Sequence, residues 1–157
     1  MKTNKVTRPG KKKSVTKAKK VKGNYYKIIS KSKKTVQYVK PVKKNIISVT
    51  IPSSIKLNGK RYKVTGIVAN AFKNCKKLKK VTIGTNVNSI GKRTFYGCSK
   101  LRTIKVKTSK LTGSRVGKQA FKGLNKKAVI KVPKKQLKAY KRLFRAKGVG
   151  KKVTIKK

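Results

Sequence analysis

The stretch VTGIVANAFKNCKKLKKVTIG (64–84) decides the fold, because it returns as VNSIGKRTFYGCSKLRTIKVK (87–107) and as SRVGKQAFKGLNKKAVIKVP (114–133). Phe72 returns as Phe95 after 23 residues, and the third copy follows at a step of 26 residues. The three extra residues of that step fit the segment that joins the second and third copies. A fixed period of roughly 20 to 50 residues is typical of repeat architectures.

Six apolar positions keep the same phase in the first two copies, and the third copy keeps five of them. They are Ile67, Phe72, Cys75, Leu78, Val81 and Ile83, then Ile90, Phe95, Cys98, Leu101, Ile104 and Val106, and in the third copy Val116, Phe121, Leu124, Ile130 and Val132. One such unit cannot bury its own apolar face, so neighbouring units must stack. The pattern predicts an α/β repeat fold: a short, strand-rich solenoid with one narrow, continuous core.

Each copy predicts one strand and one tight turn. In the strand LKKVTI (78–83), alternation puts Val81 and Ile83 inward and Lys80 and Thr82 on the open face. The segment NAFKNC (70–75) is expected to form a short helical turn with a buried apolar stripe. The repeated phenylalanines belong to this stripe, which favours a role in the core over base stacking. Tyr96 is the one aromatic of the repeats expected outside.

The flanks divide the chain into a basic tail or linker at 1–23 and a solenoid at 24–157, made of 24–64, the three repeats of 65–133, and 134–157. The tail, with one apolar residue at a time, is expected to be disordered. The part before the repeats predicts a hairpin at Tyr25–Lys40 and an incomplete repeat strand at Ile46–Ile51. A second hairpin at Ile55–Val64 should turn at Asn58-Gly59, whose residues suit the positive φ angles of a type I′ turn.

After Pro133 the period becomes helical. Leu137, Tyr140, Leu143 and Phe144 share one face, and Gly148 lies where a helix C-terminus is expected. We expect this helix to cover the last repeat, since repeat arrays need capped ends. The segment 153–155 predicts a final edge strand, whose flanking lysines discourage pairing with another chain.

Charge is the extreme feature of the composition. The 157 residues include 50 Lys and Arg and no Asp, Glu or His, which gives a net charge of +50. Either the natural environment selects a polycation or the sequence was engineered or filtered for charge. Carboxylate–lysine ion pairs are excluded except at the C-terminal carboxylate. A cationic chain of this kind is attracted to polyanions.

The same composition excludes most catalytic chemistry. General acid–base pairs and Ser/His/Asp or Cys/His triads need carboxylates or histidine. Two cysteines alone cannot make a structural zinc site, and no Gly-rich phosphate loop occurs. We therefore expect no enzyme activity and no cofactor. Cys75 and Cys98 occupy equivalent places in successive repeats, which allows a disulfide, but two buried free thiols are the favoured interpretation.

Stacking would align basic residues of successive repeats: Lys92 with Lys118, Lys77 with Lys100 and Lys126, and Lys105 with Lys131. Strand neighbours lie about 5 Å apart, so such rows could follow a linear polyanion. A solvated charged surface is the alternative. The candidate polyanion-binding residues are Lys77, Lys80, Lys92, Lys100, Arg102, Lys105, Lys118, Lys126 and Lys131.

The motif IGxxAFxxCxxLxxVxI resembles the BspA-type leucine-rich repeat of bacterial cell-surface and secreted proteins. It stands at 67–83 (IVANAFKNCKKLKKVTI) and 90–106 (IGKRTFYGCSKLRTIKV), whereas 116–132 has Leu124 for the cysteine and Lys127 for the leucine. The resemblance implies a leucine-rich-repeat solenoid at the cell surface or secreted. It also implies adhesion, or binding of proteins or glycans, without catalytic residues.

Two functions therefore stand at this point. The first is a non-catalytic surface or secreted adhesion module whose cationic solenoid holds wall teichoic acid, acidic glycans or protein partners. The second is a nucleic-acid-binding protein without sequence preference, because polycations bind phosphate backbones. No signal peptide is visible in this chain and no apolar run is long enough to span a membrane. An exported protein would have its signal removed or carried by a longer precursor.

Self-repulsion predicts an unusual salt response. Raising NaCl from about 0.01 M to about 0.1 M shortens the Debye length from about 30 to about 10 Å. We expect a gain of a few kcal/mol in stability. Since 1 kcal/mol shifts the melting temperature of a chain of this size by about 2–4 °C, the melting temperature followed by circular dichroism should rise by several degrees. Sucrose at equal osmolality is the uncharged control. A melting temperature that responds equally to salt and sucrose would contradict self-repulsion as the cause.

Overall fold

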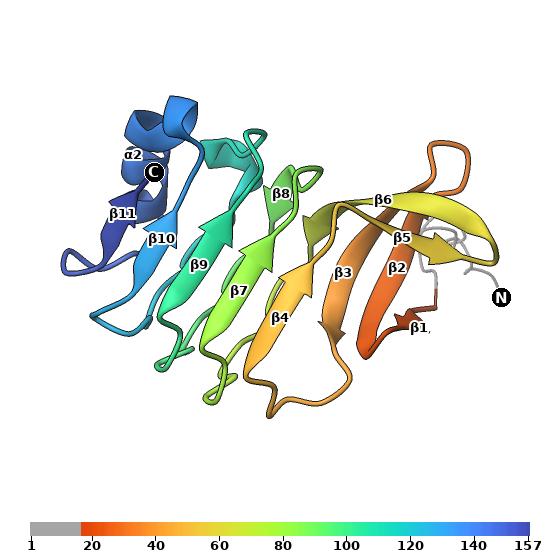
Figure 1. Ribbon diagram of the computed structural model, residues 1–157, viewed down its shortest axis with the longest axis horizontal. Helices are drawn as coiled ribbons and strands as arrows, with labels where there is room; N and C mark the ends of the chain where they lie inside the picture. The colour runs from red at the N-terminus through yellow and green to blue at the C-terminus, as the bar shows by residue number, and fades with distance from the viewer. Residues whose placement is uncertain (1–16) are drawn as a thin grey trace, which may run out of the picture.

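The computed structural model describes residues 17–157, which form two sheets wound around one elongated core (Figure 1). The predicted tail at 1–16 lies outside the described residues. The expectation of disorder up to Gly23 is wrong for β1 (Lys19–Val21), which pairs antiparallel with β2 (Asn24–Ser30). Pairing on the hairpin edge satisfies the backbone of β1 and half-buries Val21.

One sheet contains a parallel strand from each rung of the solenoid. Its strands are β4 (Ser48–Ile51), β7 (Lys80–Ile83), β9 (Thr103–Val106), β10 (Val129–Lys131) and β11 (Thr154–Lys156). They lie in the order β11-β10-β9-β7-β4, which Figure 1 shows from one end of the stack to the other. All four pairings are parallel and in register without a bulge. Residues that the repeat pattern aligns, such as Val81 and Ile104, are therefore the residues that pair in the sheet.

The second sheet has the order β1-β2-β3-β6-β5, with β8 (Ser89–Ile90) paired to β6. β2 and β3 (Thr35–Pro41) pair antiparallel around the polar turn at 31–34. β5 (Ser54–Leu57) and β6 (Lys60–Ile67) also pair antiparallel. The residues between β5 and β6, Asn58 and Gly59, have φ angles of 51° and 74°, as the type I′ prediction requires.

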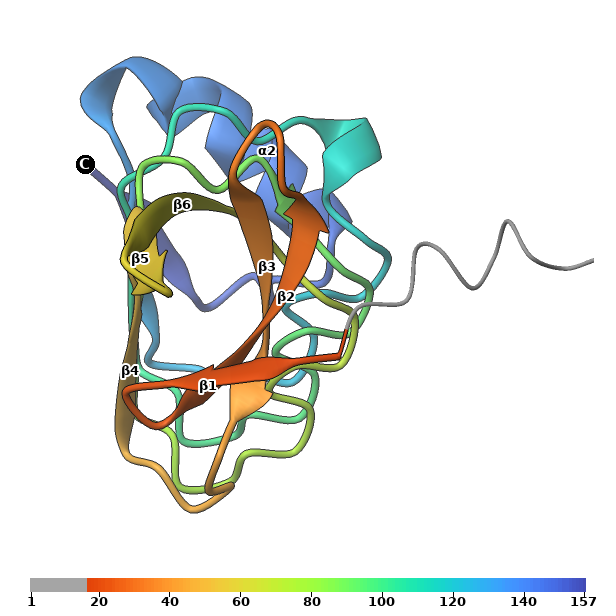
Figure 2. The same cartoon turned by 90° about the vertical axis from the view of Figure 1, so that its right-hand side faces the viewer.

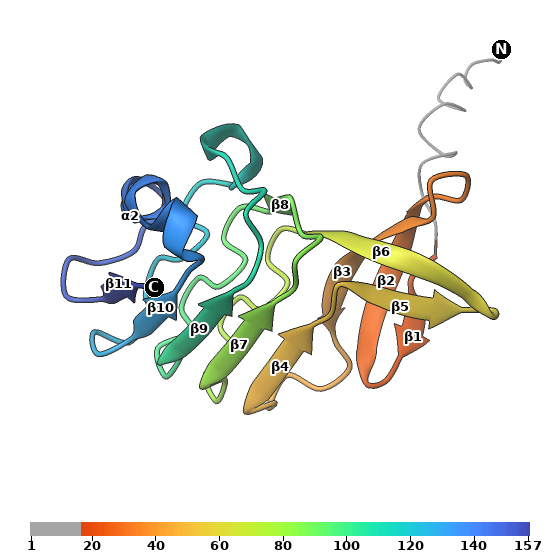
Figure 3. The same ribbon diagram turned by 45° about the horizontal axis from the view of Figure 1, so that its top comes forward.

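The two sheets face each other across the core. In Figure 2, which looks along the stack, β4 forms one wall, β2 and β3 form the opposite wall, and β1 crosses below. The β5–β6 hairpin extends toward the same end of the molecule (Figure 3). The first rung is thus flanked by antiparallel strands rather than by another repeat.

The segment predicted as a short helical turn is not helical. Residues 70–74 form consecutive turns, with positive φ at Asn70 (62°) and Asn74 (58°). Alternate N–H groups bond to the next rung, since Asn70 N–H donates to Lys92 O (3.0 Å) and Phe72 N–H to Thr94 O (2.8 Å), whereas Lys73 N–H donates to Asn70 O within the turn (3.1 Å). A helix would direct these N–H groups along the chain, so lateral pairing between rungs replaces helical pairing here.

Aromatic rings run through the core from one end to the other. The rings of Tyr38, Phe72, Phe95, Phe121 and Phe144 follow one another with centroid separations of 5.1, 5.3, 5.5 and 4.9 Å. These rings are all buried, as are the other repeated apolar positions apart from Leu124. Leu124 is only half-buried and lines a shallow surface hollow. The smaller cysteines at the equivalent positions of the other two copies are buried.

The C-terminal segment folds against the last repeat. A short 3₁₀ turn (Lys134–Gln136) leads into α2 (Leu137–Ala146), whose buried residues are Tyr140 and Phe144. Gly148 follows the helix with φ 105°, at the predicted position. Arg145 donates hydrogen bonds to the carbonyls of Gly150 and Val153, which ties the helix to the segment entering β11. No helix within residues 17–157 is long and apolar enough to cross a membrane.

Two glycines test the close approach between rungs. A Cβ on Gly91 would lie 2.5 Å from Ala69 Cα, whereas a Cβ on Gly113 would meet nothing within 4 Å. We expect Gly91→Ala to destabilise the protein by roughly 1–3 kcal/mol, as overpacking does, and Gly113→Ala to leave stability nearly unchanged. Urea unfolding of both variants measures the difference. Equal midpoints for the two variants would show that the rungs can move apart without cost.

Candidate polyanion-binding surface

The outer face of the parallel sheet carries cations in register. Lys105 pairs with Lys131, and Lys131 pairs with Lys156. Thr50 and Thr82 continue this row on β4 and β7. Because neighbouring strands are about 4.8 Å apart, the three lysine side chains leave the sheet at regular intervals of about that length. All three lysines are exposed.

A second row lies two residues earlier on the same strands and is less charged. Lys80 pairs with Ser48 on one side and with Thr103 on the other. Val129 and Thr154 continue the row toward the C-terminus. We call the two rows together the sheet face; its cations are Lys80, Lys105, Lys131 and Lys156. The hydroxyl groups beside them can donate hydrogen bonds to phosphate, sulfate or carboxylate oxygens.

The structure does not bring all nine predicted residues together. Lys92 and Lys118 occupy equivalent places in adjacent rungs, since Asn70 N–H donates to Lys92 O and Arg93 N–H donates to Lys118 O. They follow the β8 side of the coil rather than β9 and β10, so they form a separate band. A long polymer could reach both bands only by wrapping around the solenoid.

The remaining candidates lie in the turns that enter the strands. Lys77, Lys100 and Lys126 are exposed there. Arg102, also exposed, lines the shallow hollow together with Lys126 and the half-buried Leu124. This hollow, of about 430 Å³, is open to solvent. Arg102 is the member of this group that lies nearest in sequence to the sheet face.

Sequence reasoning missed Lys156 and a cluster around Tyr96. Lys156 joins the row through the parallel register alone, because Thr154 lies in the row of Lys80 and the KVTI of 152–155 is therefore shifted by two residues from the KVTI of 80–83. Tyr96 is half-buried, with Lys73 Nζ and Arg93 Cζ 5.9 and 5.8 Å from its ring centroid. Such cation–π contacts cover the ring and hold two cations beside it. No spacing rule predicts which basic residues lie beside the half-buried Tyr96.

Comparison with known proteins agrees with the repeat geometry. The family model described as the BspA type leucine-rich repeat region (6 copies) matches residues 42–157. This chain belongs to the BspA-type leucine-rich repeat family. The matched range extends beyond the three strong repeats in both directions, to the β4 rung and to the C-terminal segment. Such repeats are found in bacterial surface proteins and generally serve in binding.

Solved structures show the same fold. A leucine-rich cell surface protein from Faecalibacterium prausnitzii is 19 % identical, with a TM-score of 0.58 over 78 % of this chain and 38 % of its own. A leucine-rich repeat protein from Bacteroides capillosus is 21 % identical, with a TM-score of 0.59 over 88 % and 97 %. One from Bacteroides ovatus is 22 % identical, with a TM-score of 0.52 over 73 % and 37 %. This chain thus spans less than two fifths of the proteins from F. prausnitzii and B. ovatus. No curated protein matches the sequence.

Residues 17–157 contain no group of three side chains that could hold a metal ion. Cys75 and Cys98 are free thiols buried in the core. The Cys98 thiol donates to Phe72 O of the preceding rung (3.0 Å), which gives this sulfur a structural partner.

Burial also suppresses thiol reactivity. Desolvation raises the pKa of Cys98 to about 12 and raises the pKa of Cys75 as well. A raised thiol pKa lowers the fraction of thiolate, which is the reactive form. The cysteines of this BspA-type protein therefore serve packing rather than redox chemistry.

We expect neither thiol to react with Ellman's reagent at pH 8 while the protein is folded. In urea both thiols are exposed, their pKa returns toward about 8.5, and they should react orders of magnitude faster. The absorbance of the released thiolate gives both rates. A surface cysteine introduced by Ser109→Cys is the matched control for reagent access. Rapid native reaction of Cys98 would contradict its burial.

Proposed function

We propose that the protein is a non-catalytic, cell-surface or secreted binding module whose sheet face engages anionic polymers, with cell-wall teichoic acid and acidic glycans as the first candidates. The observation that carries this proposal is the row Lys105, Lys131 and Lys156, held in register by the parallel ladder. The family resemblance supports surface binding in general. The proposal that the ligand is a polyanion rests on the positive charge of this chain.

Electrostatics favours a linear ligand over a single ion. Two like charges about 5 Å apart repel by nearly 1 kcal/mol in water, and no carboxylate of any side chain offsets this repulsion. A polymer with evenly spaced anions would relieve the repulsion at several lysines together. Each lysine then contributes little alone, because exposed ion pairs are weak singly.

A protein surface rich in acidic residues is a further candidate partner, because it carries negative charge as the anionic polymers do.

We also propose that the β2–β3 hairpin layer and α2 act as the two ends of the solenoid, since each places an aromatic ring on the terminal phenylalanine of the repeats. These ends would keep the sheet face as the long accessible surface. Terminal units with a polar outer side keep repeat arrays soluble.

The alternative function is nucleic-acid binding without sequence preference. The same row of lysines would contact the phosphate backbone, and binding would fall steeply with salt. Phosphate contacts carry no base information, so a base preference well above tenfold would contradict this alternative. The half-buried Tyr96 is a poor stacking platform because cations already occupy its surroundings.

The test compares three polymers: teichoic acid, heparin and a random DNA duplex, each titrated with salt. We expect teichoic acid or heparin, the acidic glycan of the three, to remain bound at about 0.15 M salt while the DNA duplex is released, and the polymer that remains names the ligand class. Release of all three at the same salt concentration would show a polycation without a shaped site and would remove the specific proposal.

A variant pair locates the binding face. Lys105→Gln/Lys131→Gln/Lys156→Gln removes three charges from the sheet face, and Lys138→Gln/Lys141→Gln/Arg142→Gln removes three exposed charges from α2. We expect the first triple to weaken teichoic acid binding roughly tenfold more than the second, about 1.4 kcal/mol. Calorimetry measures both affinities. Equal losses would place binding on net charge instead of on the sheet face.

A further inference from the structure

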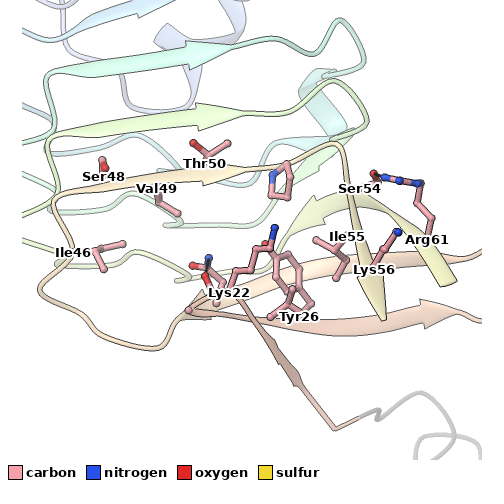
Figure 4. A pocket seen from close by; sticks show the side chains of 14 residues that line it. Lys22, Tyr26, Ile46, Ser48, Val49, Thr50, Ser54, Ile55, Lys56 and Arg61 are labelled. Carbon is pink, nitrogen blue, oxygen red and sulfur yellow. Dashed lines mark hydrogen bonds between the residues drawn. The ribbon is translucent and has the colours of Figure 1, made fainter. Parts of the chain in front are cut away.

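A cavity of about 840 Å³ opens at the N-terminal end of the solenoid, away from the sheet face cations. Its walls come from β4, from the β1–β2 turn and from the β5–β6 hairpin (Figure 4). Tyr26, Val49 and Ile55 form its apolar floor and are buried. Ile46 lines the same cavity, and its neighbour Ile47 leaves 60 % of its surface exposed. The apolar surface here is thus incompletely covered.

One wall of this cavity is an unpaired strand edge. β4 pairs with β7 on one side, and no strand within residues 17–157 pairs with its other side. The carbonyls of Ile47 and Ile51 accept hydrogen bonds from the β7 side. Because backbone groups alternate along a strand, Ser48 and Thr50 direct their N–H and C=O groups to the free edge.

This edge carries little of the usual protection. Natural sheets blunt their edges with lysine, proline or bulges. β4 reads SVTI without a charge, and its ladder with β7 has no bulge. Pro52 directly follows the strand, so an added strand could pair only as far as Ile51. At the opposite end of the same sheet, β11 carries Lys156 and is flanked by Lys151, Lys152 and Lys157. The two edges therefore differ in the way expected if one of them accepts a strand.

Cations surround the free edge. Lys22, Lys56 and Arg61 line the rim of the cavity and are exposed. Arg61 donates a hydrogen bond to Ser54 Oγ (2.9 Å), which holds the guanidinium at the rim, as Figure 4 shows. The chain offers no acidic side chain to these groups. Charge complementarity thus selects an acidic occupant.

We propose that the free edge of β4 docks an extended acidic peptide of a partner protein, which adds to the parallel sheet as a further strand. Main-chain bonds to Ser48 and Thr50 supply the pairing, alternate apolar side chains enter the cavity beside Val49, and acidic side chains meet the rim cations. A second copy of this chain is disfavoured, since it would bring another +50 charge to the same rim. This site uses the backbone edge of β4, whereas polymer binding on the sheet face uses the lysine side chains of β7, β9, β10 and β11, so the two can be tested separately.

The probe is an acetylated, amidated peptide of four Glu-Val repeats with a fluorescent label. Two versions carry backbone N-methyl groups, one on every glutamate and one on every valine. An extended strand turns these two sets of N–H groups to opposite edges, so only one set can face β4. Fluorescence anisotropy at about 0.15 M salt measures the three affinities.

We expect one methylated peptide to lose roughly tenfold or more in affinity, since about two net hydrogen bonds are lost, and the other to stay within about threefold. Loss on valine methylation would mean parallel addition, and loss on glutamate methylation would mean antiparallel addition. Affinities of the two methylated peptides that agree within about threefold would show charge-driven binding without strand addition and would overturn the proposal.

Protein variants place the site. Thr50→Pro removes one edge N–H and leaves the β7 ladder intact, as proline at an edge allows, so peptide affinity should fall. Lys56→Gln/Arg61→Gln should weaken binding roughly tenfold more than the matched helix pair Lys141→Gln/Arg142→Gln. Circular dichroism checks that each variant folds. Equal losses for the two pairs, or a dimer in sedimentation without peptide that Thr50→Pro abolishes, would reject the peptide as occupant.

Discussion

Lateral backbone pairing between rungs is the constraint on which the rest of this structure depends. On one wall the parallel strands pair in register, and on the other the turn N–H groups of one rung reach the carbonyls of the next. A rung that changed its length within these segments would leave buried donors unpaired, which is costly. The 26-residue step is tolerated because its extra residues lie outside the paired segments.

Buried hydrogen bonds fix the inserted segment that joins the second and third repeats. The Thr108 hydroxyl donates to Val87 O (2.6 Å), and the Tyr140 hydroxyl donates to Thr108 O (2.9 Å) while accepting from Leu111 N–H (3.2 Å). Tyr140 belongs to α2, so the helix both covers Phe121 and satisfies the loop that precedes the third repeat. Burial raises the pKa of Tyr140, which keeps its hydroxyl proton in place as a donor.

Register also explains how a chain of +50 can present organised charge. The aromatic stack and the aliphatic positions beside it hold the rungs about 5 Å apart, and this spacing then applies to every side chain outside. The regular spacing brings the like charges of Lys105, Lys131 and Lys156 close together, and a polymeric anion would reduce the repulsion between them. The N-terminal cavity adds a second kind of surface, in which backbone groups rather than charges face outward.

Much of this protein is determined by its sequence alone. The phase of the apolar residues is enough to predict the strands, the buried positions and the pairing of Lys105 with Lys131, because a repeat must place equivalent residues side by side. The Asn58-Gly59 turn follows from its two residue types, and the C-terminal helix follows from its own period. The candidate bands follow only as alignments between rungs, so the sequence leaves open which face each band occupies.

Only the tertiary structure decides which wall each residue occupies. It separates the Lys92 band from the sheet face and adds Lys156. It replaces the expected helical turns by lateral turns at Asn70 and Asn74, and it pairs β1 with the hairpin instead of leaving it in the tail. The free edge of β4 and its cavity depend on segments far apart in the sequence, from Lys22 to Arg61. Periodicity reports what one rung contributes, whereas an edge, a rim or a cavity exists only where different segments meet in space.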